Sequence, residues 1–323
     1  MQFPRRRFLH LAGSTLATSL FPRLALALDY PTRPMHLVVG FPAGLAPDIV
    51  ARVIAEPLSE RLGQNIVIDN RPGAGSNIAA ETVVRAPADG YTLLYITLGN
   101  AINASFYKHL DFDITREIAP VAGTVRSPSV LVVSPSVPAQ TLSEFIAYAK
   151  ANAGKINFAS GGVGTAPHLA GELFKQMAGV DLVHVPYSSS YMPDLLAGRV
   201  QVTFAPIATS LANIQAGKLR ALAVTSTTRS DVLPNIPTVS EFVPGYEASV
   251  WHGVGAPKGT SPDIISTLNR QIDAVLADPS ITARLGGLGA VPMPMTPGEF
   301  GKFVADEVKK WANVVKLAGL KSE

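Results

Sequence analysis

The sequence contains no cysteine among its 323 residues. This absence excludes disulfides, thiolate zinc sites, iron–sulfur clusters and a cysteine nucleophile. Charged residues are few, at 16%, while hydrophobic residues make up 47% and the mean hydropathy is +0.24. These values exclude a disordered chain, and the scattered 27 Gly and 26 Pro exclude a low-complexity one. A chain of this length is expected to form one large or two medium domains.

The first 27 residues have the features of a secretory signal peptide. Arginines at positions 5–7 precede an apolar run over residues 8–20, and Ala25-Leu26-Ala27 offers a small-x-small cleavage site. That run is shorter than the roughly 20 residues that span a bilayer, which disfavours a membrane anchor, and no later segment offers a long uncharged apolar run. The arginine pairs before Phe8 also fit a twin-arginine signal, so the export route stays open.

The formal net charge of +3 and the pI of about 9.1 derive from this N-terminal segment. Its removal takes away four arginines and no acidic residue, which leaves 23 Lys and Arg against 24 Asp and Glu. The remaining chain has no basic stripe, so we expect no nucleic-acid partner. The expected location is the periplasm, where a chain without cysteine cannot be mispaired by oxidation.

From residue 35 onward, short β-rich runs alternate with helical stretches, the pattern of parallel sheets covered by helices. In the first unit we predict strands at 36–40, 65–69 and 91–96, and helices at 49–62 and 77–85. Pro57 should bend or split the first of these helices, and Gly63 should end it.

A second unit repeats the pattern with different sequences. We predict strands at 130–133, 156–159, 182–185, 200–204 and 219–224, and helices at 141–152, 166–177 and 194–197. The tail is helical, with N-cap signals at Ser261-Pro262 and Thr296-Pro297, and its last helix should pack on the first unit. We therefore predict an α/β fold class with two domains, residues 28–128 with 253–323 and residues 129–252, and a ligand cleft between them.

Two loops at strand ends are candidate binding elements. Residues 41–48 join the first strand to the first helix, and residues 160–168 have the same placement in the second unit. Ligands of open α/β sheets bind beyond the carboxyl ends of strands, and N–H groups at helix N-termini favour anions. Asp48 is also a candidate N-cap of the helix at Ile49. Two such loops, one in each domain, predict an anion clamp.

Nucleotide binding, metal binding and catalysis have less support in the sequence. Residues 160–168 contain neither the G-x-G-x-x-G fingerprint nor a phosphate-binding loop, and residues 73–77 fail the fingerprint too. The six histidines show no metal-ligand spacing, and Ser160 is not in a G-x-S-x-G elbow. We therefore expect no catalytic residue, no metal and no cofactor.

Seven ordered segments resemble the tripartite tricarboxylate transporter receptor family, the Bug-type extracytoplasmic solute-binding proteins. They are Tyr30-Pro31, residues 41–42 with 48–52, and residues 70–75, 89–94, 164–172, 184–187 and 217–224. The resemblance spans nearly the whole expected mature chain. It implies a two-domain periplasmic-binding-protein-like fold (type II) that closes on a small organic carboxylate and delivers it to membrane permease subunits.

In this family the two loops would contact a ligand carboxylate through backbone groups, hydroxyls and ordered water. The candidate ligand-binding residues are Phe41, Ala43, Gly44, Leu45, Asp48, Asn100, Ser160, Gly161, Gly164, Thr165, His168, Tyr187 and Ala205.

Three departures from the family pattern concern this pocket. Leu45 follows Gly44 where paired glycines are usual, residues 188–191 replace a Lys-Gly stretch, and Ala205-Pro206 stands where an Asp is common. These changes predict a less polar pocket, suited to an aromatic or otherwise apolar carboxylate.

The leading hypothesis is thus a monomeric periplasmic receptor that binds a carboxylate by hinge closure, without chemistry. One alternative keeps the binding module but lets the liganded protein signal to a membrane sensor. A further alternative is a hydrolase that uses Ser160 and His168.

Overall fold

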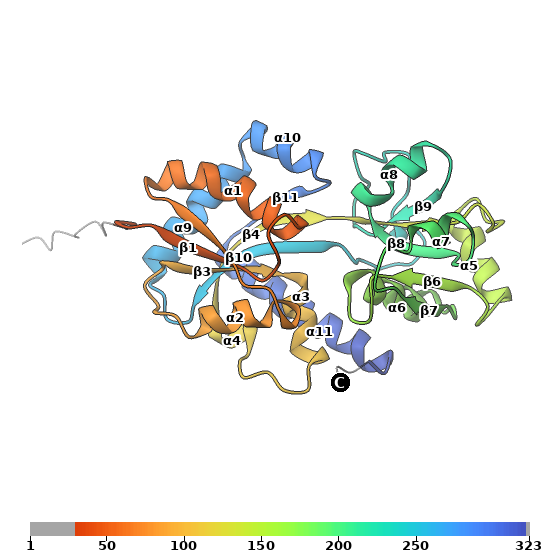
Figure 1. The fold of residues 1–323 in the computed structure, drawn as a ribbon, viewed down its shortest axis with the longest axis horizontal. Helices are drawn as coiled ribbons and strands as arrows, with labels where there is room; N and C mark the ends of the chain where they lie inside the picture. The colour runs from red at the N-terminus through yellow and green to blue at the C-terminus, as the bar shows by residue number, and fades with distance from the viewer. Residues whose placement is uncertain (1–29, 321–323) are drawn as a thin grey trace, which may run out of the picture.

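The computed structural model describes residues 30–320, so the expected signal peptide at residues 1–27 lies outside the described residues. This part of the chain folds into two lobes, each built on one sheet with helices around it (Figure 1). None of its helices is long and apolar enough to cross a membrane.

The first lobe contains a six-stranded sheet in the order β11-β4-β10-β3-β1-β2. Strands β1 to β3 are parallel, whereas β10 runs antiparallel to β3 and β4. The elements of this lobe are β1 (Met35–Val39), α1 (Ala46–Leu62), β2 (Ile66–Asn70), the 3-10 turn Ala74–Ser76, α2 (Asn77–Val84), β3 (Thr92–Thr97), α3 (Leu98–Phe106), α4 (Ile114–Glu117), β4 (Ile118–Ser127), β10 (Val250–Pro257), α9 (Pro262–Leu276), α10 (Pro279–Gly287), β11 (Val291–Met295) and α11 (Pro297–Leu317).

The second lobe contains a five-stranded sheet in the order β7-β6-β8-β5-β9. Its elements are β5 (Ser129–Val133), α5 (Leu142–Ala151), β6 (Asn157–Ser160), α6 (Ala166–Ala178), β7 (Val183–Pro186), α7 (Met192–Leu196), β8 (Val202–Pro206), α8 (Ile207–Gln215), β9 (Arg220–Val224) and the 3-10 turn Val239–Glu241. Every strand and helix predicted above has a counterpart within three residues. Pro57 does not split α1, which continues through it to Leu62 and ends, as predicted, at the left-handed Gly63.

Two strands connect the lobes. β4 leads into β5 with only Pro128 between them, and β10 brings the chain back (Figure 1). The two strands pair with each other in the first lobe, up to Ser127 and Val250. The crossing is therefore a short two-stranded hinge, which the sequence analysis did not predict as strands.

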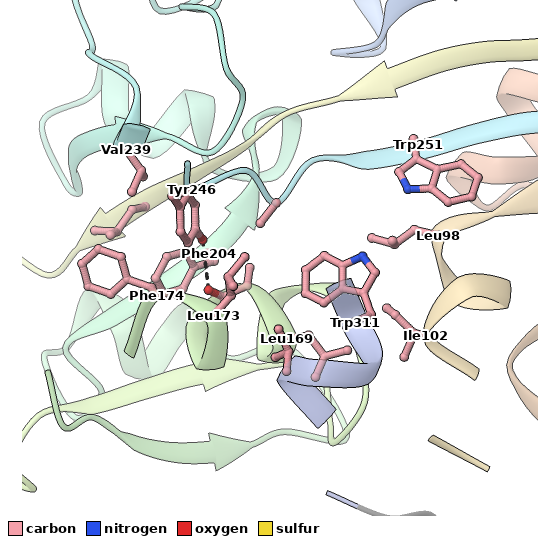
Figure 2. Packing of buried hydrophobic residues seen from close by; sticks show 14 of the residues in the cluster. Leu98, Ile102, Leu169, Leu173, Phe174, Phe204, Val239, Tyr246, Trp251 and Trp311 are labelled. Carbon is pink, nitrogen blue, oxygen red and sulfur yellow. Dashed lines mark hydrogen bonds between the residues drawn. The ribbon is translucent and has the colours of Figure 1, made fainter. Parts of the chain in front are cut away.

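Helix α11 packs on α3 and β4 of the first lobe, as predicted for the last helix, and also reaches α6 of the second. Figure 2 shows Trp311 with Leu98 and Ile102 on one side and Leu169 on the other. All four side chains belong to one buried apolar cluster that contains residues of both sheets. The lobes thus share a core at the end of α11.

Candidate functional site

A cavity of about 370 Å³ lies between the lobes. The carboxyl ends of the parallel strands β1 and β3 open toward it, which is where open α/β sheets bind ligands. Its walls come from the first lobe, from the loop before α6 in the second lobe, and from the hinge strand β10. The lining residues are Phe41, Pro47, Gly75, Thr97, Leu98, Gly99, Ile102, Asn103, Phe106, Tyr107, Val163, Gly164, Thr165, Ala166, Val250 and His252.

The N-terminus of α3 forms one wall of this cavity. Thr97 and Asn100 form a capping box, in which Oδ1 of Asn100 accepts the backbone N–H of Thr97 at 2.9 Å. The capping box satisfies the N–H of Asn100, whereas Leu98 and Gly99 occupy the first helical positions, where N–H groups have no helical acceptor. Both residues line the cavity. Asn100 itself is buried and supports this turn from behind.

The N-terminus of α6 contributes the facing wall. Its N-cap residue Thr165 makes no side-chain cap, because its Oγ1 donates to the carbonyl of Gly162 at 2.7 Å. The first turn of α6 therefore also presents uncapped backbone N–H groups at Ala166 and His168, since Pro167 has none. Two helix N-termini, one from each lobe, meet at one cavity. That arrangement favours a negatively charged group between them.

The loop before α6 is supported from behind by two histidines. Oγ of the fully buried Ser160 lies 2.6 Å from Nε2 of His184 and 3.0 Å from the carbonyl of Gly162. Nδ1 of His168 accepts the N–H of Gly164 at 3.0 Å. The two imidazole rings stack with centroids 3.7 Å apart. Burial lowers the pKa of His168 to about 3 and that of His184 to about 4, with the charge of Lys175 acting in the same direction, so both rings are neutral at pH 7.

Asp48 does not cap its helix, contrary to the sequence-based expectation. The helix begins earlier, at Ala46 with Leu45 as N-cap, because Pro47 is favourable in a first turn. The buried carboxylate of Asp48 accepts hydrogen bonds from Gly44 N–H (2.8 Å), Arg52 Nε (3.0 Å) and Asn70 Nδ2 (2.9 Å). Burial alone would raise the pKa of this carboxyl, but the three hydrogen bonds hold it below its usual value. Asp48 therefore fixes the loop from inside the lobe.

Of the predicted ligand-binding residues, Phe41, Gly164 and Thr165 line the cavity. Tyr187 instead donates its hydroxyl to Asp194 at 2.8 Å, and Ala205 is buried within β8. Asn100 lies behind the first turn of α3 without lining the cavity. The remaining predicted residues lie in or behind the two loops and do not line the cavity either: Ala43, Gly44, Leu45, Asp48, Ser160, Gly161 and His168.

At the start of α3 the sequence predicted only Asn100, and it did not predict Leu98, Gly99 or the hinge strand as parts of the cavity. The available signal was the strand ending at Thr97, since β3 is parallel to β1 and ends at the same sheet edge. Nothing in the sequence indicated that His252 lines the cavity. Its position opposite Thr97 results from the antiparallel pairing of β10 with β3.

Among residues 30–320, no lysine and no arginine line the cavity. Its two ionisable side chains are Tyr107 and His252, and His252 is only 4% exposed. Nδ1 of His252 lies 3.3 Å from the hydroxyl of buried Tyr95, and Nε2 makes no hydrogen bond within the described chain. Burial lowers the pKa of His252 to about 4, so the ring is neutral at pH 7. An anion in this cavity would meet neutral N–H donors instead of cations.

Among residues 30–320, no group of three or more His, Asp or Glu side chains is placed to hold a metal ion. The hydroxyl of Ser160 faces His184 rather than His168 and is fully buried. This geometry does not offer Ser160 to a substrate in the cavity.

Comparison with known proteins gives consistent matches. The model of the family described as tripartite tricarboxylate transporter family receptor matches residues 50–320. Protein BugT of Bordetella pertussis is 37% identical over 320 residues, which cover 98% of each chain.

Three solved structures share the two-lobed fold of a periplasmic binding protein. R. palustris Rpa4515 with adipate is 39% identical with a TM-score of 0.75 and covers 91% of this chain and 99% of its own. Periplasmic binding protein BugD is 35% identical with a TM-score of 0.72, over 91% and 100% of the two chains. MatC from Rhodopseudomonas palustris with bound malate is 30% identical with a TM-score of 0.71, over 88% and 100%.

Proposed function

Because the chain belongs to the tripartite tricarboxylate transporter receptor family, we propose that it is a periplasmic receptor for a small organic carboxylate. The observation that carries this proposal is the meeting of the α3 and α6 N-termini at one cavity between the lobes. Relatives of 39% and 30% identity hold adipate and malate. The receptor acts as a monomer after removal of residues 1–27 and delivers its ligand to membrane permease subunits, without chemistry.

Ligand capture follows from the hinge. We infer that the domains predicted at 28–128 with 253–323 and at 129–252 form the two lobes, with the second crossing within β10. A carboxylate that binds N–H groups of both lobes is held by both walls only when they close together, so binding shifts the protein toward the closed form.

The lining favours a ligand with an apolar body. Several apolar side chains line the cavity together with the two helix N-termini, namely those of Phe41, Ile102, Phe106, Val163 and Val250. Since no cationic side chain in the described part of the chain lines the cavity, a second carboxylate would lack a charged partner there. A monocarboxylate or a long, flexible dicarboxylate with an aromatic or aliphatic body is therefore preferred over a compact tricarboxylate.

The test is calorimetric titration and thermal unfolding of the mature protein with adipate, malate, benzoate and citrate. A ligand at 100 times its Kd should stabilise the protein by about 2.7 kcal/mol. We expect a saturable effect with adipate or benzoate and the weakest with citrate. A folded protein that binds none of a broad acid panel would contradict the proposal.

Two variants that each add a negative charge test whether the carboxylate binds in this cavity. Val163→Asp places a carboxylate on an exposed cavity wall, and Val232→Asp makes the same change on an exposed loop elsewhere. Repulsion should weaken carboxylate binding at least tenfold in the first variant and leave it unchanged in the second. Equal affinities in both variants would place the ligand outside this cavity.

A further inference from the structure

The hinge has a second face, opposite the cleft. Val250 and His252 of β10 line the cleft, so Trp251 between them points to the other side of the sheet. Arg126 of β4 is the paired residue of Trp251, and paired residues of antiparallel strands share a face. The Arg126 side chain therefore extends from the back of the hinge.

A cavity of about 520 Å³ lies at this back face. Both lobes line it, through β11 of the first lobe and the loop after β9 of the second. Its lining residues are Arg126, Pro128, Ser226, Thr228, Arg229, Ser230, Asp231, Val291, Pro292, Met293 and Met295.

The guanidinium of Arg126 has a hydrogen-bond donor that no group in the described part of the chain accepts there. Among residues 30–320, the buried Nε of Arg126 has no hydrogen-bond partner and its guanidinium forms no ion pair. The group lies 5.7 Å from the ring centroid of Phe303, a contact that holds the planar group without occupying its donors. A buried donor without an acceptor is costly, and a guanidinium offers five donors in a fork that fits an oxyanion. Arg229 differs, because Glu241 already engages it at 3.0 and 2.8 Å.

We propose that the back of the hinge is a second binding site, at which Arg126 holds a small oxyanion of the sulfate, phosphate or carboxylate type between the two lobes. Ser230 and Thr228 supply further hydroxyl donors on the wall from the second lobe. Asp231, also on that wall, opposes the anion and lowers its affinity. Because residues of both lobes line the site, its shape depends on the angle between them. Anion binding at the back and ligand binding in the cleft are therefore coupled.

The experiment titrates the mature protein with sulfate, phosphate and acetate at constant ionic strength, with chloride as the balancing anion. Calorimetry measures affinity, and a second readout is the tryptophan fluorescence, to which Trp251, the residue paired with Arg126, contributes together with Trp311. Wild-type protein should bind sulfate or phosphate saturably. Arg126→Gln should weaken that binding at least tenfold, since it removes a charge-assisted pair of hydrogen bonds. Arg33→Gln changes an exposed arginine of the first lobe and should have no effect.

Asp231→Asn tests the same site in the opposite direction, because removal of the opposing charge should strengthen sulfate binding several-fold. This variant keeps the proposal testable even if Arg126→Gln folds poorly. The proposal is overturned if none of the three anions binds saturably, or if binding is unaffected by Arg126→Gln and Asp231→Asn. Sulfate binding that is weakened by Val163→Asp and not by Arg126→Gln would place the anion in the front cleft and would equally overturn it.

Discussion

Asp48 ties three segments of the first lobe together. Its carboxylate binds the loop at Gly44 and the side chains of Arg52 and Asn70, and Asn70 in turn donates to the carbonyl of Phe41 at 2.9 Å. Asp48→Asn keeps the shape but loses the charge, so the free energy of unfolding should fall by about 1–3 kcal/mol in urea titrations. Asp263→Asn, in the exposed first turn of α9, should cost less. Equal losses in both variants would contradict a buried network at Asp48.

His252 is the side chain that we expect to report directly on the ligand. If the Tyr95 hydroxyl donates to Nδ1, then Nε2 carries the hydrogen and can donate to a carboxylate in the cavity. His252→Phe keeps an aromatic ring and removes that donor, so adipate or benzoate affinity should fall about tenfold, measured by calorimetry. His36→Phe, at an exposed position of β1, is the matched control. Unchanged affinity in His252→Phe would exclude this role.

At the residue scale, the sequence could not predict which way the side chains of the two loops point. Ser160 and His168 are polar residues in a glycine-rich loop, which also describes residues that contact a ligand. The structure turns both inward, onto His184 and the backbone of Gly164. The partner His184 comes from β7, which pairs with β6 in the sheet. Such a contact depends on the tertiary fold and has no local sequence pattern.

At the scale of single elements, α6 illustrates how close packing positions a binding turn. A Cβ on Gly171 would lie 2.5 Å from the ring of Phe158, so this glycine lets α6 approach β6. Gly171→Ala should lower the free energy of unfolding by about 1–3 kcal/mol although alanine favours helices, because the helix must shift. Gly286→Ala in α10, where nothing lies within 4 Å, should stabilise by up to about 1 kcal/mol. Urea unfolding of both variants tests the pair, and effects of the same sign would contradict this packing.

The elements themselves were largely predictable, because caps and periodicity are local. The capping box of Thr296 with Glu299 and the Ser261 cap form as the sequence predicts. Pro57 did not split helix α1 as its sequence position suggested. The helix continues through it, and seven of the helix residues are buried. Tertiary burial there outweighs the cost of one missing hydrogen bond. The hinge strands β4 and β10 contain Gly and Pro, which obscured their strand character.

At the scale of the whole molecule, stability should depend on pH through buried neutral histidines. His168 and His252 have folded-state pKa values lowered to about 3 and about 4, mainly by burial. The unfolded chain binds protons near pH 6.5, so stability is full above that pH and is lost as the pH falls toward 4. Each histidine contributes up to about 1.4 kcal/mol per pH unit in that window.

Urea unfolding at pH 7.5, 5.5 and 4.5 should show this loss. His252→Phe removes one of the buried histidines with a lowered pKa and should flatten the slope, whereas His36→Phe at an exposed position should leave it intact. A stability that stays constant from pH 7.5 to 4.5 would contradict the burial of neutral imidazoles.

The shared core at the end of α11 predicts how the two lobes unfold. Trp311 is fully buried and packs with side chains of both lobes (Figure 2). Its Nε1 and that of Trp251 donate to the same carboxylate oxygen of Glu307, at 2.9 and 2.8 Å, which connects α11 to the hinge strand. Since these contacts join both lobes, the wild type should unfold in one cooperative transition.

Trp311→Ala should remove about 3–5 kcal/mol and break the apolar connection between the lobes. Scanning calorimetry should then resolve two transitions, because each sheet keeps its own helices while the shared core is lost. Trp311→Phe retains most of the buried surface and should preserve a single transition at a lower temperature. Two transitions already present in the wild type would mean that the lobes fold independently, and that ligand closure meets no resistance from the core around Trp311.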